Sequence, residues 1–219
     1  MRILIDTLDL KEIKKYSNMG IISGVTTNPT FSKLFGMRDD LETVEKVSEA
    51  LDGKGEIFIE AFGYDANEIE DNARRIADES SYDNLVFKVP FTESGVEATS
   101  NLSEGGFFKV NLHLIYSVNQ ALIAEQAGAA YICPLIGRMD DIGNDGIENI
   151  AKMKSCYKIN SVKTKIMGSS IRSANHVIEL YKIGVDVATI PPKVLEKMFY
   201  HPLTTDGFEI FAEDLKNIE

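Results

Sequence analysis

The chain has 219 residues, of which 44 % are hydrophobic and 26 % charged, proportions that exclude wholesale disorder. Its 34 acidic residues outnumber its 23 basic ones, and the net charge of −11 disfavours nucleic-acid binding, which needs a basic face. Because two cysteines cannot build a disulfide scaffold and no apolar run approaches the roughly 20 residues of a membrane helix, we expect a cytoplasmic protein without membrane contact.

Short apolar runs alternate with longer amphipathic runs along the whole chain. The short runs predict eight strands, at 3–6, 24–28, 57–61, 85–89, 107–112, 130–134, 165–168 and 185–190. Between them, apolar residues recur at helical spacing, as Ile69, Ala73 and Ile76 do. The pattern therefore predicts repeated strand–helix units.

Residues that begin and end helices stand between these runs. Asp9, three positions before Glu12, predicts the start of the first helix, and Gly20 predicts its end. Thr92 predicts the start of the fourth helix, and Gly184 the end of the seventh. Local signals thus agree with the hydrophobic pattern.

Eight units in 219 residues average about 27 residues each, which suits a (β/α)₈ TIM barrel near its lower size limit of roughly 200 residues. The alternative is an open doubly wound sheet, which often carries a glycine-rich turn after its first strand. Here 6–9 contain no glycine. We favour one barrel domain over 1–219, with an extra C-terminal helix at about 204–216.

Barrel enzymes place their catalytic groups at the C-terminal ends of the strands. The polar residues at or just beyond those ends include Asp6, Thr26, Thr27, Asn28, Glu60, Lys88, Asn111, His113, Cys133, Arg138, Ser170 and Arg172. None of the three histidines has metal-ligand spacing, and the acidic loop at 140–146 does not fit a calcium loop. We therefore expect no metal.

Lys88 lies among apolar neighbours, where desolvation lowers the pKa of an ammonium group. A neutral amine is what imine formation with a ketone requires. The alternative is a lysine with a solvated head group or a structural carboxylate partner. Asp6 and Glu60 would face the same opening, either to shuttle protons or to cap helices and form buried ion pairs.

A phosphate site is predicted beyond the seventh strand, where barrels of this kind often bind phosphate. Ser170 and Arg172 lie there, and arginine offers phosphate a bidentate fork. Arg138 supplies a second cation or, alternatively, a surface salt bridge to Asp140 or Asp141.

Several motifs occur in order along nearly the whole chain. They include GVTTNP at 24–29, FKVPFT at 87–92, GRMDDIG at 137–143, SSIR at 169–172 and HPLT at 201–204. With these motifs the chain resembles the transaldolases, in particular the short single-domain group that also contains fructose-6-phosphate aldolase.

The resemblance implies a (β/α)₈ barrel and a Schiff-base reaction without a cofactor. Lys88 would attack the keto carbon of a ketose phosphate such as fructose 6-phosphate, and Asp6 would take and later return the proton that opens the C3–C4 bond. A dihydroxyacetone unit would stay on Lys88 as an enamine until an aldose phosphate, such as erythrose 4-phosphate, accepts it. Glu60 would help position the water that serves imine formation.

The resemblance also implies the substrate contacts and the assembly. The substrate-binding residues would be Thr27, Asn28, Asn111 and Cys133, with Arg138, Ser170 and Arg172 around the phosphate. Sugar phosphates would be the substrates, and the protein would form a homo-oligomer, a pentamer or a decamer.

Three positions depart from the family pattern. His113 replaces a threonine that helps to hold the catalytic water, and we predict that it takes over that role, since a pKa near 6.5 lets it share proton transfer. Cys133 replaces a serine and Leu135 an aromatic ring. Glu60 and Asn111 accompany transaldolases within the family, so transfer is favoured. The alternatives are an aldolase that releases free dihydroxyacetone and an idle barrel that only binds sugar phosphates.

Overall fold

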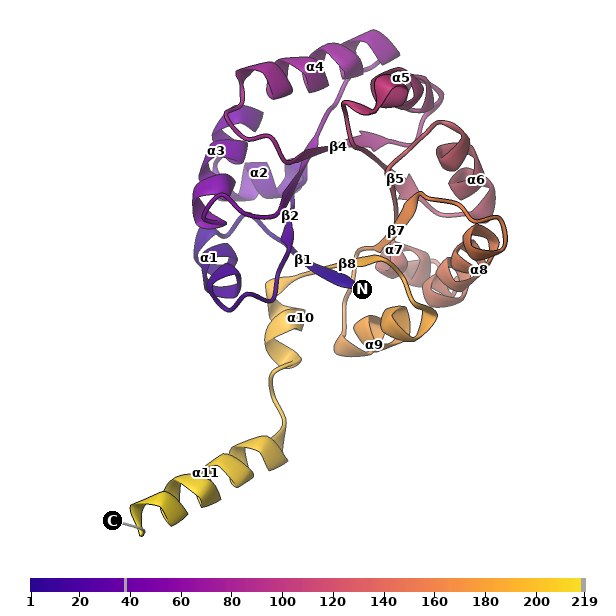
Figure 1. Ribbon diagram of the computed structural model, residues 1–219. Coiled ribbons are helices and arrows are strands. Elements are labelled where there is room, and N and C mark those ends of the chain that lie inside the picture. The colour runs from indigo at the N-terminus through magenta and orange to yellow at the C-terminus, as the bar shows by residue number, and fades with distance from the viewer. Residues whose placement is uncertain (38, 218–219) are drawn as a thin grey trace.

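The computed structural model describes residues 1–37 and 39–217 and shows a closed barrel of parallel strands (Figure 1). The strands follow one another in chain order, and the last pairs with the first through Leu4 and Thr189. They are β1 (Arg2–Asp6), β2 (Gly24–Thr26), β3 (Glu56–Glu60), β4 (Leu85–Pro90), β5 (Val110–Ile115), β6 (Tyr131–Pro134), β7 (Lys165–Gly168) and β8 (Val187–Ile190). The predicted (β/α)₈ barrel is confirmed, and the open sheet is excluded.

Helices surround the barrel and connect successive strands (Figure 1). They are α1 (Leu10–Asn18), α2 (Pro29–Phe35), α3 (Asp40–Ala50), α4 (Ala66–Glu79), α5 (Glu93–Ser103), α6 (Val118–Gln126), α7 (Ile136–Asp141), α8 (Gly146–Ile159), α9 (Ala174–Ile183), α10 (Pro192–Lys197) and α11 (Pro202–Lys216), with a 3₁₀ turn η1 (Glu104–Gly106). The Asp9 side chain accepts from the Glu12 amide and the Thr92 side chain from the Gly95 amide, which confirms both predicted caps.

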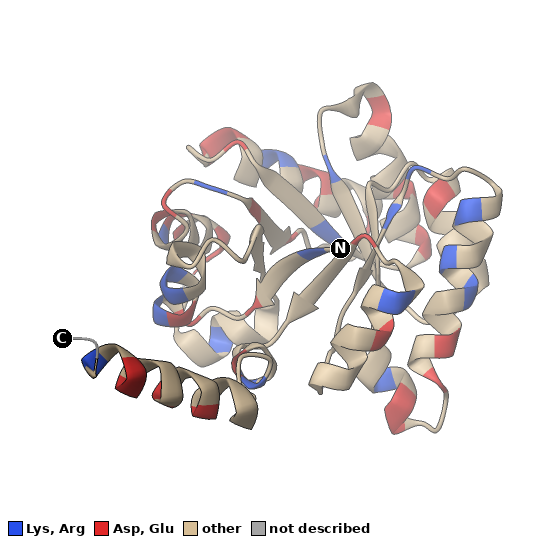
Figure 2. Cartoon of the chain, turned by 60° about the horizontal axis from the view of Figure 1, so that its bottom comes forward, with Lys and Arg blue, Asp and Glu red and all other residues tan. Residues whose placement is uncertain are grey.

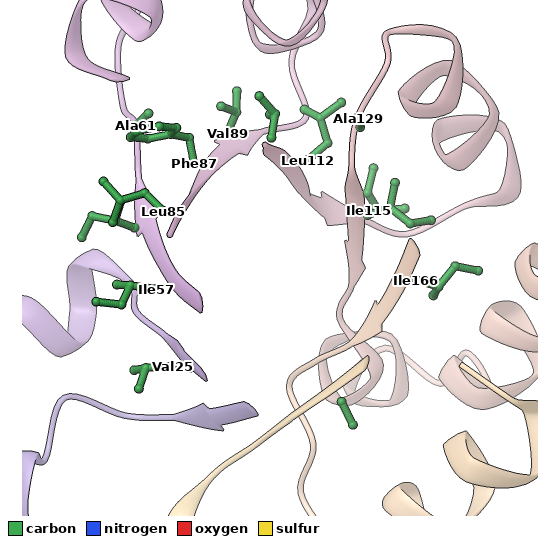
Figure 3. Packing of buried hydrophobic residues seen from close by; sticks show 14 of the residues in the cluster. Val25, Ile57, Ala61, Leu85, Phe87, Val89, Leu112, Ile115, Ala129 and Ile166 are labelled. Carbon is green, nitrogen blue, oxygen red and sulfur yellow. The ribbon is translucent and has the colours of Figure 1, made fainter. Parts of the chain in front are cut away.

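Side chains alternate along each strand between the barrel interior and the helices. On β3, Ile57 and Ile59 belong to the layer between strands and helices, part of which Figure 3 shows. Phe58 belongs instead to the interior, with Leu4 and Val86 among its neighbours. The interior positions at the strand ends are therefore the ones that can carry polar groups into a site.

Three strand predictions need correction, one of which is the strand expected at 185–190, which begins at Val187. The strand expected at 107–112 begins only at Val110, because η1 and two glycines with positive φ precede it and leave Phe107 exposed. The strand expected at 24–28 ends at Thr26, because Asn28 accepts a hydrogen bond from the Phe31 amide and begins α2.

The predicted C-terminal helix is present as α11, which extends away from the barrel (Figure 1, Figure 2). Leu203, Phe208 and Phe211 on this helix are exposed to solvent. Among the helices of residues 1–37 and 39–217, none combines the length and hydropathy that crossing a bilayer requires.

Candidate active site

A cavity of about 360 Å³ opens at the C-terminal end of the barrel. Asp6, Glu60, Lys88 and His113 line it, and they come from β1, β3, β4 and β5. The four residues predicted as catalytic therefore meet in one place, because the parallel strands all end at the same side.

Lys88 is buried on β4, with its head group inside the barrel. Its Nζ donates to the backbone carbonyl oxygen of Thr27 at 2.5 Å and lies 3.3 Å from Oε2 of Glu60. A solvated head group is thus excluded. The other alternative, a carboxylate partner for Lys88, is present as Glu60. This carboxylate also lines the cavity, so the ion pair belongs to the candidate site.

Glu60 connects the lysine to His113, whose Nε2 lies 2.6 Å from Glu60 Oε1. Burial disfavours the charged carboxylate, but the hydrogen bond from His113 and the charge of Lys88 outweigh it and lower the pKa of Glu60. Burial lowers the pKa of His113, and the charges of Lys88 and Arg138 add to this despite Glu60. At neutral pH an uncharged imidazole therefore donates to an ionised carboxylate.

Asp6 stands at the end of β1 with its Oδ1 2.7 Å from the hydroxyl of Thr26, which donates to it. Burial raises the pKa of the Asp6 carboxyl, against the hydrogen bond from Thr26 and the charge of Lys88. A carboxyl with a raised pKa is suited to exchanging protons near neutral pH.

Two buried groups beside Lys88 remain without a hydrogen-bond partner. Asn111 is paired with Lys88 in the strand register, and among the described residues neither its amide nitrogen nor its oxygen has a partner in hydrogen-bond geometry, although its amide is near enough to the Cys133 thiol to lower the pKa of that group. Oε2 of Glu60 has none either, since its contact with Lys88 lacks hydrogen-bond geometry. Buried polar groups are nearly always paired in folded proteins, so these atoms indicate space for a ligand or water.

Thr27 and Asn28 are held by the backbone around them. The Thr27 hydroxyl donates to the carbonyl oxygen of Phe58 at 2.8 Å, so this residue presents its backbone carbonyl, rather than its hydroxyl, to Lys88. Asn28 lines the cavity while its side chain caps α2. Cys133 also lines the cavity, and burial raises the pKa of its thiol to about 11. The thiol is therefore neutral and a poor nucleophile.

At the predicted phosphate site, Arg138 and Ser170 line the cavity. Arg172 instead pairs with Asp141 through its two terminal guanidinium nitrogens, Nη1 and Nη2. Within the described chain Arg138 has no ion-pair partner, so its expected alternative role in a surface salt bridge is wrong. Asp141 is taken by Arg172, and Asp140 lies 3.5 Å from His176.

Comparison with known proteins identifies the family of this barrel. The sequence model for transaldolase/fructose-6-phosphate aldolase matches residues 3–219. The chain belongs to the transaldolase/fructose-6-phosphate aldolase family. A probable transaldolase of Nitrosopumilus maritimus is 41 % identical over 100 % of this chain and 96 % of the relative. Probable transaldolase 1 of Listeria monocytogenes is 42 % identical over 98 % and 97 %.

These relatives make the chain an enzyme of the transaldolase or aldolase type. A solved thiamine phosphate pyrophosphorylase from Pyrococcus furiosus superposes with a TM-score of 0.58 over 87 % of this chain and 85 % of that one. Its sequence identity is only 16 %, and it shows the barrel fold alone.

Residues that the sequence did not assign to the site also line the cavity of this transaldolase-family barrel, among them Thr26, Thr189 and Leu114. The two threonines occupy interior positions of their strands, so strand alternation could have found them. Leu114 has a φ of 60° at an irregularity of β5 between His113 and Ile115. The sequence contains no signal that predicts a leucine in the left-handed region of backbone conformation. Strained residues of this kind are common at functional sites.

Proposed function

We propose that this protein is a transaldolase, which transfers a dihydroxyacetone unit from a ketose phosphate to an aldose phosphate through a Schiff base on Lys88. The observation that carries the proposal is a buried amine held between Glu60 and Thr27, with the unpaired amide of Asn111 beside it. The substrates would place the enzyme in the pentose phosphate pathway, in the cytoplasm.

Imine formation begins when the ammonium group of Lys88 gives a proton to the Glu60 carboxylate beside it, and the freed amine adds to the keto carbon of the substrate. The resulting carbinolamine loses its hydroxyl as water, which requires a proton on the leaving oxygen. Glu60 contacts both Lys88 and His113, so a proton can pass between the amine and a water molecule through this carboxylate. The free amide of Asn111 is available to bind a hydroxyl of the three-carbon unit.

Cleavage of the carbon–carbon bond is assigned to Asp6. Its carboxylate takes the proton of the C4 hydroxyl, the C3–C4 bond breaks, and the electron pair of that bond moves into the protonated imine (iminium) to give a neutral enamine. The aldose phosphate leaves, and the enamine adds to the aldehyde carbon of the acceptor while Asp6 returns the proton to the new hydroxyl. The raised pKa of Asp6 favours this return.

Transfer is preferred to simple aldol cleavage because release of free dihydroxyacetone requires protonation of the enamine carbon. His113 is uncharged at neutral pH, the thiol of Cys133 has a pKa of about 11, and Glu60 is ionised. These three groups are therefore weak proton donors to the enamine. The protonated Asp6 is the remaining donor, and its proton is needed for the new hydroxyl that forms when the acceptor aldehyde is attacked.

The deciding experiment is product analysis by mass spectrometry after the purified protein is mixed with fructose 6-phosphate and erythrose 4-phosphate. Sedoheptulose 7-phosphate with glyceraldehyde 3-phosphate supports transfer. Free dihydroxyacetone would move the assignment to the aldolase. An idle sugar-phosphate-binding barrel would give no product and no covalent adduct after borohydride reduction.

The phosphate is assigned to Arg138 and Ser170, which line the cavity, with Arg172 joining once it leaves Asp141. We also propose a homo-oligomer, a pentamer or a decamer, in which a second copy covers the exposed apolar side chains of α11. Sedimentation equilibrium tests this assembly. A single 24.3 kDa species at micromolar concentration would contradict it.

A further inference from the structure

Two threonine hydroxyls stand in a row behind Asp6. Thr26 Oγ1 lies 2.7 Å from Asp6 Oδ1 and 2.5 Å from Thr189 Oγ1. Both threonines are only 2 % exposed, and they reach from β2 and β8, the two strands that flank β1 in the barrel (Figure 1). Asp6 at the end of β1 is thus supported by a buried chain of hydroxyls from both neighbouring strands.

The direction of this chain follows from proton counting. An ionised carboxylate can only accept hydrogen bonds, so Thr26 must give its single hydroxyl proton to Asp6. The bond between the two threonines then requires Thr189 to be the donor and Thr26 the acceptor. Aligned donors polarise one another and strengthen each bond. Asp6 Oδ1 is consequently held as an acceptor, and Oδ2 is left to exchange a proton with the substrate.

We propose that Thr189 is a positioning residue for proton transfer, which acts on Asp6 through Thr26 and keeps the Asp6 carboxylate oriented and ionised between turnovers. This inference rests on the proposed function, in which Asp6 takes the substrate proton. Thr189 lines the cavity, but its hydroxyl is bonded to Thr26, so its effect on Asp6 passes through one intermediate hydroxyl.

The charges that face Asp6 make such support necessary. Burial raises the pKa of Asp6, and only the hydrogen bond from Thr26 and the charge of Lys88 oppose it. Cys133 is the other titratable group in electrostatic contact with Asp6, and its thiol is neutral. Without the hydroxyl chain, only the charge of Lys88 would oppose the effect of burial on the pKa of Asp6. Asp6 would then be protonated over a wider pH range.

The test uses valine, which replaces a hydroxyl by a methyl group of similar shape. The variants are Thr26→Val, Thr189→Val and the double variant. Thr99→Val is the matched control, because Thr99 is equally buried but donates to the Gly95 carbonyl within α5. The pKa of Asp6 is measured from the NMR shift of its carboxyl carbon, assigned with Asp6→Asn. The acidic limb of the kcat/KM profile is measured in parallel.

We expect Thr26→Val to raise the pKa of Asp6 by about one pH unit, because it removes a hydrogen bond to a charged group. Thr189→Val should raise it by roughly 0.3, the share expected from lost cooperativity. Thr99→Val should leave it unchanged. The double variant should match Thr26→Val, since Thr189 acts only through Thr26.

The inference is overturned if Thr189→Val leaves both the pKa of Asp6 and the acidic limb in place, or if the two valine shifts add in the double variant. The NMR measurement does not depend on turnover. A wild-type protein without activity, in which Thr189→Val still raises the pKa of Asp6, would therefore overturn the proposed function and support the hydroxyl chain.

Discussion

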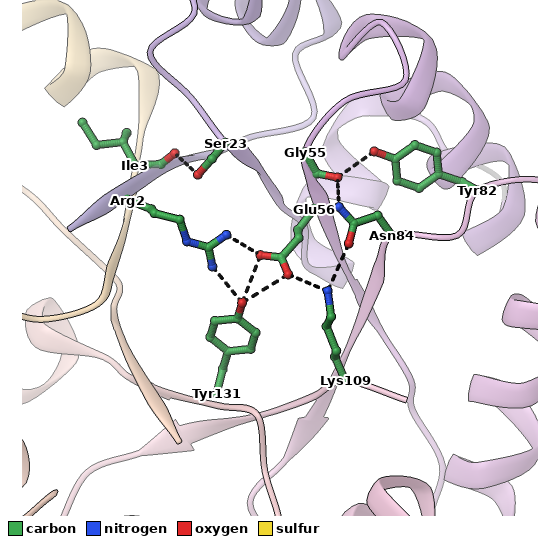
Figure 4. Close-up of polar contacts among 9 residues, drawn as sticks. All are labelled: Arg2, Ile3, Ser23, Gly55, Glu56, Tyr82, Asn84, Lys109 and Tyr131. Carbon is green, nitrogen blue, oxygen red and sulfur yellow. Dashed lines mark hydrogen bonds and ion pairs between the residues drawn. The ribbon is translucent and has the colours of Figure 1, made fainter. Parts of the chain in front are cut away.

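Each end of the barrel carries a polar cluster around a glutamate of β3, but the two clusters differ in how fully their polar atoms are hydrogen-bonded. Glu56 begins the strand and Glu60 ends it. At the N-terminal end, Arg2, Lys109 and Tyr131 converge on Glu56 (Figure 4). Arg2 Nη1 and Lys109 Nζ lie 2.8 and 3.0 Å from its two oxygens, and the Tyr131 hydroxyl donates to it at 3.0 Å.

The cluster around Glu56 is closed, because both carboxylate oxygens have partners within the chain. Burial disfavours the charged form of Glu56, but hydrogen bonds from Lys109 and Arg2 outweigh it and lower its pKa. Around Glu60, by contrast, one carboxylate oxygen and both polar atoms of Asn111 lack hydrogen bonds. The difference indicates that the N-terminal cluster stabilises the fold, whereas the C-terminal cluster keeps bonding capacity for a ligand.

The two lysines give the sharpest test of this contrast. Lys88→Met removes the proposed nucleophile, so we expect turnover to fall by at least about 10⁴-fold and the borohydride-trapped adduct to disappear. Lys109→Met is the matched control, because it removes a lysine that contacts the other glutamate. The intact mass after reduction with substrate reports the adduct. An adduct on the Lys88→Met protein, or none on Lys109→Met, would break the comparison.

The two glutamates should both support stability but differ in their effect on activity. Glu56→Gln leaves the charges of Arg2 and Lys109 without their partner. Because both are partly exposed, we expect a loss of about 2 kcal/mol in the free energy of unfolding, below the range for fully buried pairs. Glu60→Gln should slow turnover by about 100-fold, whereas Glu56→Gln should leave turnover near the wild-type rate. Because Glu60 pairs with the buried Lys88, its replacement should cost at least as much stability as that of Glu56. Urea unfolding and steady-state kinetics on both variants check this, and an equal loss of turnover in the two variants would contradict it.

The pH dependence of unfolding provides a second measure of Glu56. Its pKa is lowered in the folded state, so its contribution to stability is complete above the unfolded value of about 4.3 and is lost as pH falls through the folded value. The wild-type protein should therefore lose stability steeply below about pH 4.3. The Glu56→Gln protein should show a shallower dependence, and an unchanged slope would remove Glu56 from the account.

Much of the barrel and of its C-terminal site is predictable from the sequence, because both depend on local patterns. The alternation of apolar and amphipathic runs predicted the strands, and the capping residues predicted the helix ends. The strand ends then predicted that Asp6, Glu60, Lys88 and His113 lie around one opening. The strand predicted at 107–112 begins three residues later than expected, because the sequence alone does not distinguish an exposed phenylalanine such as Phe107 from a buried one. Only the glycines at 105 and 106 indicate the turn that precedes the strand.

Contacts between distant side chains were beyond local patterns. Arg172 could be placed after β7, but its pairing with Asp141 depends on how α7 packs against that loop. Gly137 permits the packing, because a Cβ there would lie within 2.4 Å of the Arg172 guanidinium group. The link between Thr26 and Thr189 likewise joins residues 163 positions apart.

His113→Ala tests whether the open cluster depends on its histidine. The substitution removes the donor that holds Glu60, so the pKa of Glu60 should rise and turnover should fall by about tenfold. Burial lowers the pKa of His113 below its unfolded value, so this residue costs stability as pH falls below about 6.5, and the alanine variant should lose that dependence. An unchanged rate and pH profile would show that His113 has no part in the water relay.

The ion pair between Arg172 and Asp141 is an exception at the C-terminal end of the barrel, because both side chains already have a partner, as in the cluster around Glu56. Both side chains are about half exposed, and so the pair is weak. Asp141→Asn should release Arg172 toward the cavity and lower KM for the phosphorylated acceptor roughly threefold, with kcat unchanged. Asp140→Asn is the control, because it removes the same charge from an aspartate next to His176.

The direction of the change in KM decides what the pair does. If Asp141→Asn lowers KM and Asp140→Asn does not, Asp141 competes with phosphate for the guanidinium group, and substrate binding must first break this contact. If both variants lower KM equally, the effect is only the loss of negative charge near the cavity. An increase in KM for Asp141→Asn alone would mean that Asp141 holds Arg172 in position for phosphate. The open end would then contain a preformed ion pair of the kind that stabilises the opposite end.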